Sequence, residues 1–241
     1  MGRPSIAFPP MPPAQPILLT LAGLGALYVG IQIVLPHLWK KGQIRKLHDE
    51  VRGKLILTYD DGPWDGLTPE LLGLLQKRGA RASFFMLGEK VEVAPELARS
   101  VAEAGHEVGS HSYSHHHPWK SAPWTRLQDL ARGHSTLSAA GLEPAGHRPP
   151  YGKLCADSAF WLGRAGQGIR WWTHDSGDSG GPLDVAACLR SVREAGGAVV
   201  LMHDGYAPGE RHAYVLEVTA ALLDLADEQG WEVGGFELLG G

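Results

Sequence analysis

Short apolar runs alternate with amphipathic segments from residue 53 to the end of the chain. The apolar runs have the length of strands, and we predict strands at 54–59, 82–87, 106–110, 169–173, 198–202 and 231–236. The segments between them carry apolar residues at helical spacing, and we predict helices at 69–78, 95–104, 124–140, 159–165, 183–195 and 214–229. Strands that alternate with helices form βαβ units, so the pattern predicts an α/β domain with a parallel sheet. Periodicity alone does not distinguish a closed barrel from an open sheet.

The chain before residue 53 has a different composition. Residues 1–16 hold six prolines, and we expect them to be disordered. Residues 17–35 carry no charge and are long enough to cross a bilayer, so we assign 17–36 to a transmembrane helix and 37–52 to a basic linker. A cleavable signal peptide is the alternative, although its apolar core is usually shorter and a small-x-small cleavage site should follow it. A buried helix is disfavoured because the run is apolar all round.

The charges around this run leave its orientation open. Lys40, Lys41, Arg45 and Lys46 follow the run, whereas only Arg3 precedes it. The positive-inside rule therefore places the second part of the chain in the cytoplasm. Long domains can be translocated regardless of flanking charge, so the opposite orientation stays open as well.

Polar side chains follow several of the predicted strands. Asp60 and Asp61 follow the strand at 54–59, and His111 follows the strand at 106–110. His203 follows the strand at 198–202. In α/β folds the loops at the carboxyl ends of strands carry the chemistry, so we expect these side chains to share one site.

One carboxylate and two imidazoles form a three-ligand metal set that leaves positions open for water and substrate. We assign the metal to Asp61, His111 and His115, and this donor set suits Zn²⁺ and also Co²⁺ or Ni²⁺. His116 and His117 extend the histidine run, and either could replace His115. The His-x-x-x-His spacing is found in zinc proteases, but those need glutamate after the first histidine, where this chain has serine.

The neighbouring polar residues suit acid–base work. Asp60 is the candidate general base, and a nearby cation such as Arg148 keeps a carboxylate ionised. His203 is the candidate general acid, with Asp178 to hold its ring and raise its pKa. Asp175 could assist, but we rank it below Asp178.

Together these clusters resemble the motifs of the NodB-homology polysaccharide deacetylases, carbohydrate esterase family four. Thr-Tyr-Asp-Asp-Gly-Pro at 58–63 resembles the first motif and His-Ser-Tyr-Ser-His at 111–115 the second. Arg-Pro-Pro-Tyr-Gly at 148–152 resembles the third, and Leu-Met-His at 201–203 the fifth. The fourth motif, Asp-x-x-Asp-Trp, is partial, because 175–179 reads Asp-Ser-Gly-Asp-Ser.

The resemblance covers residues 53–241 and implies an irregular (β/α)7 barrel of the NodB-homology type behind the transmembrane helix. It implies a metal-dependent hydrolase that removes N-acetyl groups from the amino sugars of a polysaccharide such as peptidoglycan or a chitin-like glycan. It also implies the pairing of Asp60 with Arg148, and it places Tyr151, Pro150 and Leu201 at the oxyanion and substrate site, with the amide of the tyrosine as oxyanion donor.

Most of this family acts outside the membrane, so we expect a single-pass membrane protein with an extracytoplasmic catalytic domain. Two alternatives stay open. One is deacetylation or deformylation of a lipid-linked sugar at the cytoplasmic face, and the other is an inactive glycan-binding domain. The intact base, cation and acid positions disfavour the inactive domain.

Composition adds a few limits. The net charge is −4 and no basic run in the second half of the chain is interleaved with aromatic residues, so we expect no nucleic-acid partner, and nothing implies a protein partner. Cys155 and Cys188 could pair or could be two buried free thiols. Ser179 replaces the family tryptophan that forms one wall of the sugar groove; Trp171 and Trp172 could compensate, although we expect them in the core.

Overall fold

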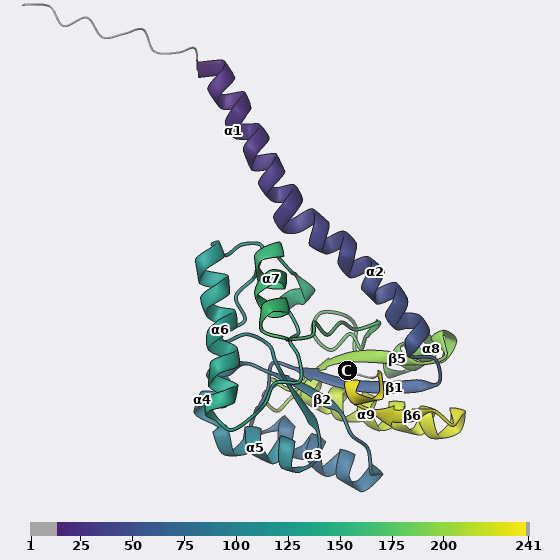
Figure 1. Ribbon diagram of the computed structural model, residues 1–241. Helices are drawn as coiled ribbons and strands as arrows, with labels where there is room; N and C mark the ends of the chain where they lie inside the picture. Colours follow the sequence, from purple (N-terminus) through teal and green to yellow (C-terminus); the bar gives the residue numbers. More distant parts are fainter. Residues whose placement is uncertain (1–13, 240–241) are drawn as a thin grey trace, which may run out of the picture.

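The structure is a computed structural model that describes residues 14–239; most of the predicted disordered segment 1–16 lies outside the described residues. A long N-terminal helix leads into an α/β domain (Figure 1). The strands are β1 (Lys54–Asp60), β2 (Ser83–Met86), β3 (Glu107–Ser110), β4 (His174–Asp175), β5 (Ala198–His203) and β6 (Glu232–Gly234). The α-helices are α1 (Ala14–Val29), α2 (Leu35–Glu50), α3 (Leu67–Arg78), α4 (Gly88–Val93), α5 (Pro95–Glu103), α6 (Pro123–Ala139), α7 (Ala156–Arg164), α8 (Val185–Ala195) and α9 (Glu210–Gln229). A π-helical turn, η1 (Gly30–Val34), joins α1 to α2, and η2 (Pro150–Gly152) and η3 (Phe236–Leu239) are 3-10 turns.

The strands form one parallel sheet in the order β3-β2-β1-β5-β4, and β6 pairs with the first half of β1. Two single-residue bridges, from Ser110 to His147 and from His147 to Ile169, continue the sheet beyond β3. The chain runs on from Ile169 to β4, so the bridges close the sheet into an irregular barrel in which His147 takes the place of a seventh strand. The predicted α/β barrel behind an apolar N-terminal helix is confirmed.

Strand β1 lies at the centre of the sheet because both of its faces are apolar. Leu55, Leu57 and Tyr59 are buried in one apolar cluster with residues of α3, α5 and α9. Ile56 points the other way into a second cluster, which includes Phe85. Continuous apolar runs are typical of parallel strands covered on both sides, and each fully buried side chain of this size stabilises the fold by roughly 1.5–3 kcal/mol.

Two elements differ from the sequence prediction. Helix α4 is not predicted, since its six residues are too few to show a helical repeat. The predicted strand at 169–173 is wrong, because regular pairing starts only with β4. The amide of Arg170 donates to the carbonyl of His147 (2.9 Å), whereas the amide of Thr173 donates to that of Val199 (3.0 Å). The segment therefore passes from one neighbour to the other and forms a ladder with neither.

The N-terminal helix is continuous through η1 and into the domain. Within the described chain it is the one helix long and apolar enough to cross a membrane, with a mean hydropathy of 2.1 in its most apolar 18-residue window, and either a membrane anchor or a signal sequence would have this property. The basic segment 37–52 is helical as far as residue 50. Leu47 and Val51 are buried in the same cluster as Ile56, so this segment packs on the domain.

The two cysteines lie on separate elements and form no disulfide. Cys155 directly precedes α7, and Cys188 lies in α8. Both are buried free thiols. Burial raises the pKa of each to about 11, so neither is a reactive thiolate at neutral pH.

Candidate active site

The predicted site residues lie at one end of the barrel. Strand β1 ends at Asp60, and its register places this residue beside Phe85 of β2 and His203 of β5. Strand β3 ends one residue before His111. Because the strands are parallel, their carboxyl ends share one rim, which is where such folds bind ligands. A groove of about 650 Å³ lies over this rim.

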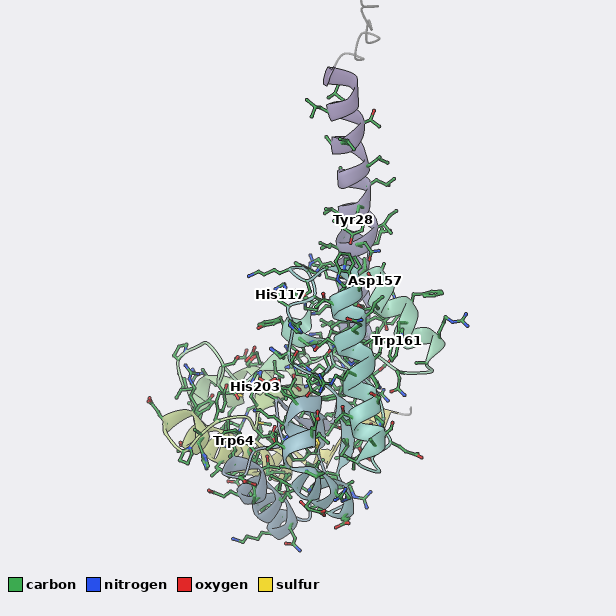
Figure 2. All side chains as sticks on the ribbon, turned by 90° about the vertical axis from the view of Figure 1, so that its left-hand side faces the viewer. Tyr28, Trp64, His117, Asp157, Trp161 and His203 are labelled. Carbon is green, nitrogen blue, oxygen red and sulfur yellow. The ribbon has the colours of Figure 1, made fainter. Side chains whose placement is uncertain are left out.

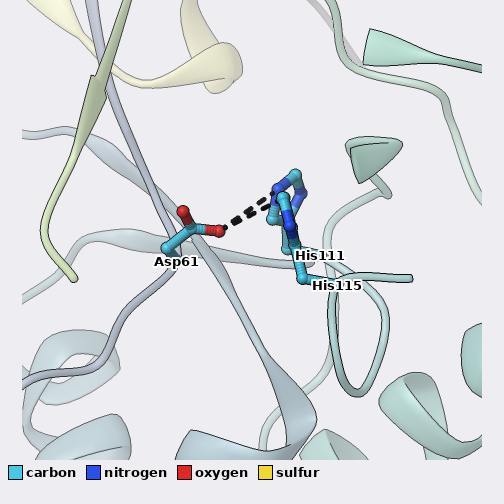
Figure 3. Close-up of side chains that lie close together, drawn as sticks. All are labelled: Asp61, His111 and His115. Carbon is cyan, nitrogen blue, oxygen red and sulfur yellow. Dashed lines mark ion pairs between the residues drawn. The ribbon is translucent and has the colours of Figure 1, made fainter. Parts of the chain in front are cut away.

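Asp61, His111 and His115 form one group of potential metal ligands (Figure 3). Oδ1 of Asp61 lies 3.5 Å from Nε2 of His111 and 3.5 Å from Nε2 of His115. The three ligand atoms lie within 4.8 Å of one another. This carboxylate oxygen is buried and has no hydrogen-bond partner in the described chain. An unpartnered carboxylate oxygen between two imidazole nitrogens is a donor set that fits a divalent metal.

The surroundings of these three groups suit metal binding. Nδ1 of His111 donates to the backbone carbonyl of Arg148 at 2.7 Å, which leaves the lone pair on Nε2. Burial, and next the neighbouring His111, lower the pKa of His115 to about 4, so this ring is neutral at pH 7. Burial acts to raise the pKa of Asp61, but nearby positive charge, including that of His203 and Lys90, outweighs it, and the pKa lies below its ordinary value. Neutral imidazoles and an ionised carboxylate are the forms that bind metals.

The next two histidines have other partners. Nδ1 of His116 lies 3.1 Å from Oδ1 of Asp129 on α6. The ring of His117 packs on the ring of Tyr151, with 4.8 Å between their centroids. In the part of the chain that the structure describes, neither ring belongs to the potential ligand group, which favours His115 over both alternatives.

Four residues of the site have left-handed backbone conformations that side chains disfavour. They are Asp61 (φ 70°), Ser112 (φ 69°), His115 (φ 56°) and Tyr151 (φ 56°), and no other described non-glycine residue has a positive φ. Such a conformation costs about 1–3 kcal/mol and persists only where its surroundings enforce it. Gly133 of α6 allows a close approach here, because a Cβ atom would lie 2.4 Å from the carbonyl carbon of Ser112. Strained backbone that is concentrated at one site indicates that these conformations serve the function of the site.

Asp60 is held by a buried arginine. Nη1 of Arg148 donates to Oδ1 of Asp60 at 2.8 Å and to Oγ1 of Thr58 at 2.8 Å. The guanidinium lies over the ring of Phe85, 4.1 Å from its centroid. Oδ2 of Asp60 faces the ligand group, 3.8 Å from Nε2 of His111. One carboxylate oxygen is thus fixed by a cation, and the other is directed toward the groove.

His203 is held by Asp178, as predicted for the pair. The backbone amide of His203 donates to Oδ2 of Asp178 at 2.7 Å, and Nδ1 donates to Oδ1 at 3.0 Å. Burial acts to lower the pKa of His203, but Asp178, with Asp60 and Asp61, outweighs it and raises the pKa to about 9. The ring is therefore an imidazolium at neutral pH, and its Nε2 carries the proton that Asp178 does not engage.

The turn at Tyr151 forms a wall of the groove. Tyr151 and Leu201 line the groove, whereas Pro150 is buried behind the turn. The tyrosine ring covers His115, with 4.4 Å between ring centroids. The amide of Gly152 is hydrogen-bonded within the turn, but the described chain offers the amide of Tyr151 no backbone acceptor.

The expectation that both Trp171 and Trp172 lie in the core is correct for only one of them. Trp171 is buried in the second apolar cluster as expected, but Trp172 lines the groove. Ser179 also lines it, and so does Tyr206, whose ring centroid lies 6.2 Å from that of His203. Sequence reasoning missed Tyr206, although its place three residues after a strand-end histidine could have indicated it. It also missed Lys153, and it considered His117, another lining residue, only as an alternative metal ligand.

Sequence reasoning likewise missed Asp204, a buried carboxylate beneath the site. Its Oδ2 accepts from Oγ1 of Thr68 at 2.6 Å, and its amide donates to the carbonyl of Asp60 at 3.0 Å. A Cβ atom at Gly62 would lie 2.2 Å from this carboxylate, so only glycine fits there. Burial raises the pKa of Asp204 to about 7. The residue supports the turn that follows β1 from below.

Comparisons with known proteins agree with this geometry. The family model described as polysaccharide deacetylase matches residues 48–167. The chain is 32% identical to a chitooligosaccharide deacetylase of Bradyrhizobium sp. (70% of this chain, 80% of the relative) and 32% identical to a peptidoglycan-N-acetylglucosamine deacetylase of Bacillus cereus (73% and 83%). It is also similar to the structure of a family 4 carbohydrate esterase from Streptomyces lividans in complex with acetate, with a TM-score of 0.69, 29% identity and coverage of 79% of this chain and 96% of the other. The chain therefore belongs to the polysaccharide deacetylases of carbohydrate esterase family four, which are hydrolases of carbon–nitrogen bonds.

Proposed function

We propose that this protein is a metal-dependent deacetylase that removes N-acetyl groups from the amino sugars of a polymeric glycan. One observation carries the proposal: the ligand group, the carboxylate held by Arg148 and the imidazolium held by Asp178 all line or adjoin one groove. These are the parts that hydrolysis of an unactivated amide needs, namely an electrophile, a base and an acid. The relatives named for chitooligosaccharides and for peptidoglycan N-acetylglucosamine support the substrate class.

Asp61, His111 and His115 would hold the metal. Zn²⁺ is our first choice for one carboxylate and two imidazoles, with Co²⁺ and Ni²⁺ as alternatives. The unpartnered oxygen of Asp61 and the hydrogen bond at Nδ1 of His111 support this fit. When bound, such a metal supplies a Lewis acid that polarises the acetyl carbonyl and makes water more acidic.

Asp60 and Tyr151 act on the attack step. Asp60 takes a proton from the attacking water through the oxygen that Arg148 leaves free. Arg148 keeps the carboxylate in place through its hydrogen bond to Oδ1. Negative charge then develops on the carbonyl oxygen. We assign the amide of Tyr151 as the donor to this oxyanion, since the described chain provides it with no other backbone partner.

His203 acts on the departing amine. Its Nδ1 donates to Asp178, so the proton on Nε2 is available to the leaving nitrogen. Breakage of the carbon–nitrogen bond then yields acetate and a free amino sugar. The raised pKa of about 9 keeps this acid protonated at neutral pH. Trp172 and Tyr206 offer aromatic faces for the sugar on the side where Ser179 replaces the family tryptophan.

We further propose that residues 17–36 anchor the chain in the cell membrane in a single pass, with the catalytic domain 53–241 outside. The exposed apolar surface of the N-terminal helix and the glycan substrates of the relatives support this arrangement. Partners are then the glycan and the membrane. The combination of base, acid and ligand group speaks against an inactive glycan-binding domain.

Substitution of the two adjacent carboxylates tests the assignment. Asp61→Asn should lose bound zinc in elemental analysis, together with activity. Asp60→Asn should keep the zinc and lose turnover by about 10²- to 10⁴-fold, the contribution of a positioned general base. Asp65→Asn, a change at an exposed carboxylate in the same loop, is the matched control and should alter neither.

Release of acetate is measured on N-acetylglucosamine oligomers, peptidoglycan and a lipid-linked N-acetyl sugar. Equal zinc loss in Asp60→Asn would reverse the two assignments. A zinc-loaded native protein that releases acetate from none of these substrates would overturn the proposed function.

A further inference from the structure

We propose that the end of the domain around α7 lies in the membrane surface, where lipid covers its exposed aromatic side chains. This inference rests on the membrane anchoring proposed above and goes beyond it, because an anchor alone could hold the domain in water, clear of the lipid.

The last part of the apolar run is bound to the domain. Nη2 of Arg126, on α6, donates to the hydroxyl of Tyr28 at 3.5 Å, and the amide of Asp157, on α7, donates to Oε1 of Gln32 at 3.2 Å. The π turn η1 packs against α7. Figure 2 shows Tyr28 at the lower end of the free helix, next to Asp157. From residue 28 onward, the helix therefore lies beside the domain surface formed by α6 and α7.

The length of the apolar run places the segment that contacts the domain in the bilayer. Residues 17–35 form a helix of about 28 Å at about 1.5 Å per residue. The hydrocarbon core of a bilayer is about 30 Å thick, so nearly the whole run is needed to cross it. Residues 28–35 must then lie in or at the edge of the membrane, and the domain surface packed beside them reaches the same depth.

The side chains at this end are of the kind that lipid accepts. Trp124 at the start of α6 is 69% exposed, and Phe160 on α7 is 68% exposed. Leu35, Leu38 and Trp39 of the helix are also exposed. Aromatic side chains favour the interface between lipid and water, and a group of exposed apolar residues marks an interaction surface.

The charged and apolar groups next to the helix fit the same environment. Arg126 and Asp157 form an ion pair with each other and are largely shielded from solvent, so this end presents no unpaired charge at the contact with Tyr28. Beside the pair, a groove of about 560 Å³ runs between the helix and α7. Leu35 and Trp39 line one side and Ala159 the other, so its walls suit an acyl chain.

Lipid contact can be measured on the full chain in vesicles of phosphatidylethanolamine and phosphatidylglycerol. A fluorescent dye is attached to Phe160→Cys or Trp124→Cys, while Cys155 and Cys188 are buried and the unsubstituted protein serves as the labelling blank. Val93→Cys, at an 86% exposed apolar position of α4 on the far side of the domain (Figure 1), is the matched control. Leu21→Cys on α1 reports whether the helix is in the membrane.

We expect spin-labelled lipids to quench the dye at 160 and 124 several-fold more than at 93, and to quench it strongly at 21. Strong quenching at 21 with equal quenching at 160, 124 and 93 would mean that the protein is anchored but its domain is clear of the membrane. That result would overturn this inference alone. Absence of quenching at 21 would overturn the anchoring as well. A blue-shifted dye at 160 without lipid quenching would mean that a second copy or another protein covers the face, and would also overturn the inference. None of these readouts depends on catalysis.

Discussion

Replacement of Asp178 by asparagine removes one charge and keeps the shape of the side chain. Asp178 accepts from the backbone amide of His203 at 2.7 Å and from its Nδ1 at 3.0 Å. Burial acts to lower the pKa of His203, and Asp178 is the main cause of its rise to about 9. Asparagine retains an acceptor for the amide but lacks the charge that favours the imidazolium. The pKa of His203 should therefore fall toward its ordinary value of 6.5.

The size of the effect follows from these two values. The difference between about 9 and 6.5 corresponds to about 3 kcal/mol, at about 1.36 kcal/mol per pKa unit. At pH 8 about 90% of native molecules would carry the imidazolium, against about 3% of Asp178→Asn molecules. The kcat/KM for an N-acetyl substrate should thus fall about 30-fold at pH 8, and this loss should disappear near pH 5.5.

The same substitution should alter stability in a pH-dependent way. The pKa of His203 is higher in the folded than in the unfolded chain, so its contribution is complete below pH 6.5 and is lost as the pH rises through about 9. Asp178→Asn should therefore lower Tm more at pH 6 than at pH 10. Calorimetry at both values measures the difference.

The assay is acetate release from pH 5 to pH 10 with the zinc-loaded full chain. Asp175→Asn is the control, because this exposed carboxylate at the end of β4 lies close to Asp178 in sequence but accepts from the amide of Gly177 at 2.9 Å. It should leave the alkaline limb in place. A profile of Asp178→Asn that falls by one factor at every pH and keeps its alkaline limb near pH 9 would refute the reasoning, since Asp178 would then only shape the loop.

Two further substitutions test contacts around the groove. Lys40→Met should lower kcat several-fold without loss of zinc, because Nζ of Lys40 donates to the carbonyl of Gly152 at 2.8 Å. Lys41→Met, at an exposed neighbouring lysine, is the control, and equal kcat values in the two variants would contradict the prediction. Gly133→Ala should reduce the free energy of unfolding by about 1–3 kcal/mol in urea titration, since its Cβ would lie 2.4 Å from the backbone of Ser112; an unchanged value would mean that α6 can move away.

The sequence predicts which side chains meet at the centre of the site, because that grouping depends on residue type and on position after a strand. Asp61 and His111 each follow a largely buried strand, and parallel strands bring their carboxyl ends together whatever the loops do. Their grouping in the structure matches this expectation. The roles of Asp60 and His203 remain predictions, now supported by their bonded partners.

Features that depend on packing between distant segments cannot be predicted from local sequence patterns. The contact of Lys40 with Gly152 joins segments 112 residues apart, and no local pattern indicates it. Trp171 and Trp172 are alike in composition and adjacent in sequence, yet one is buried and the other lines the groove, because the segment changes partners along its length. The left-handed conformation of His115 is also invisible in the sequence, since a glycine usually marks such a position.

The continuous N-terminal helix determines how far the enzyme can reach. The helix continues through η1 to Glu50, and Lys40 ties it to Gly152 at the wall of the groove. No flexible linker separates the proposed anchor from the groove, so in that arrangement the fold itself sets the height of the groove above the bilayer. Lys40 lies four residues past the end of the proposed span, which is about 6 Å along the helix. With the membrane anchoring proposed above, an enzyme held this way reaches only glycan strands that lie close to the membrane.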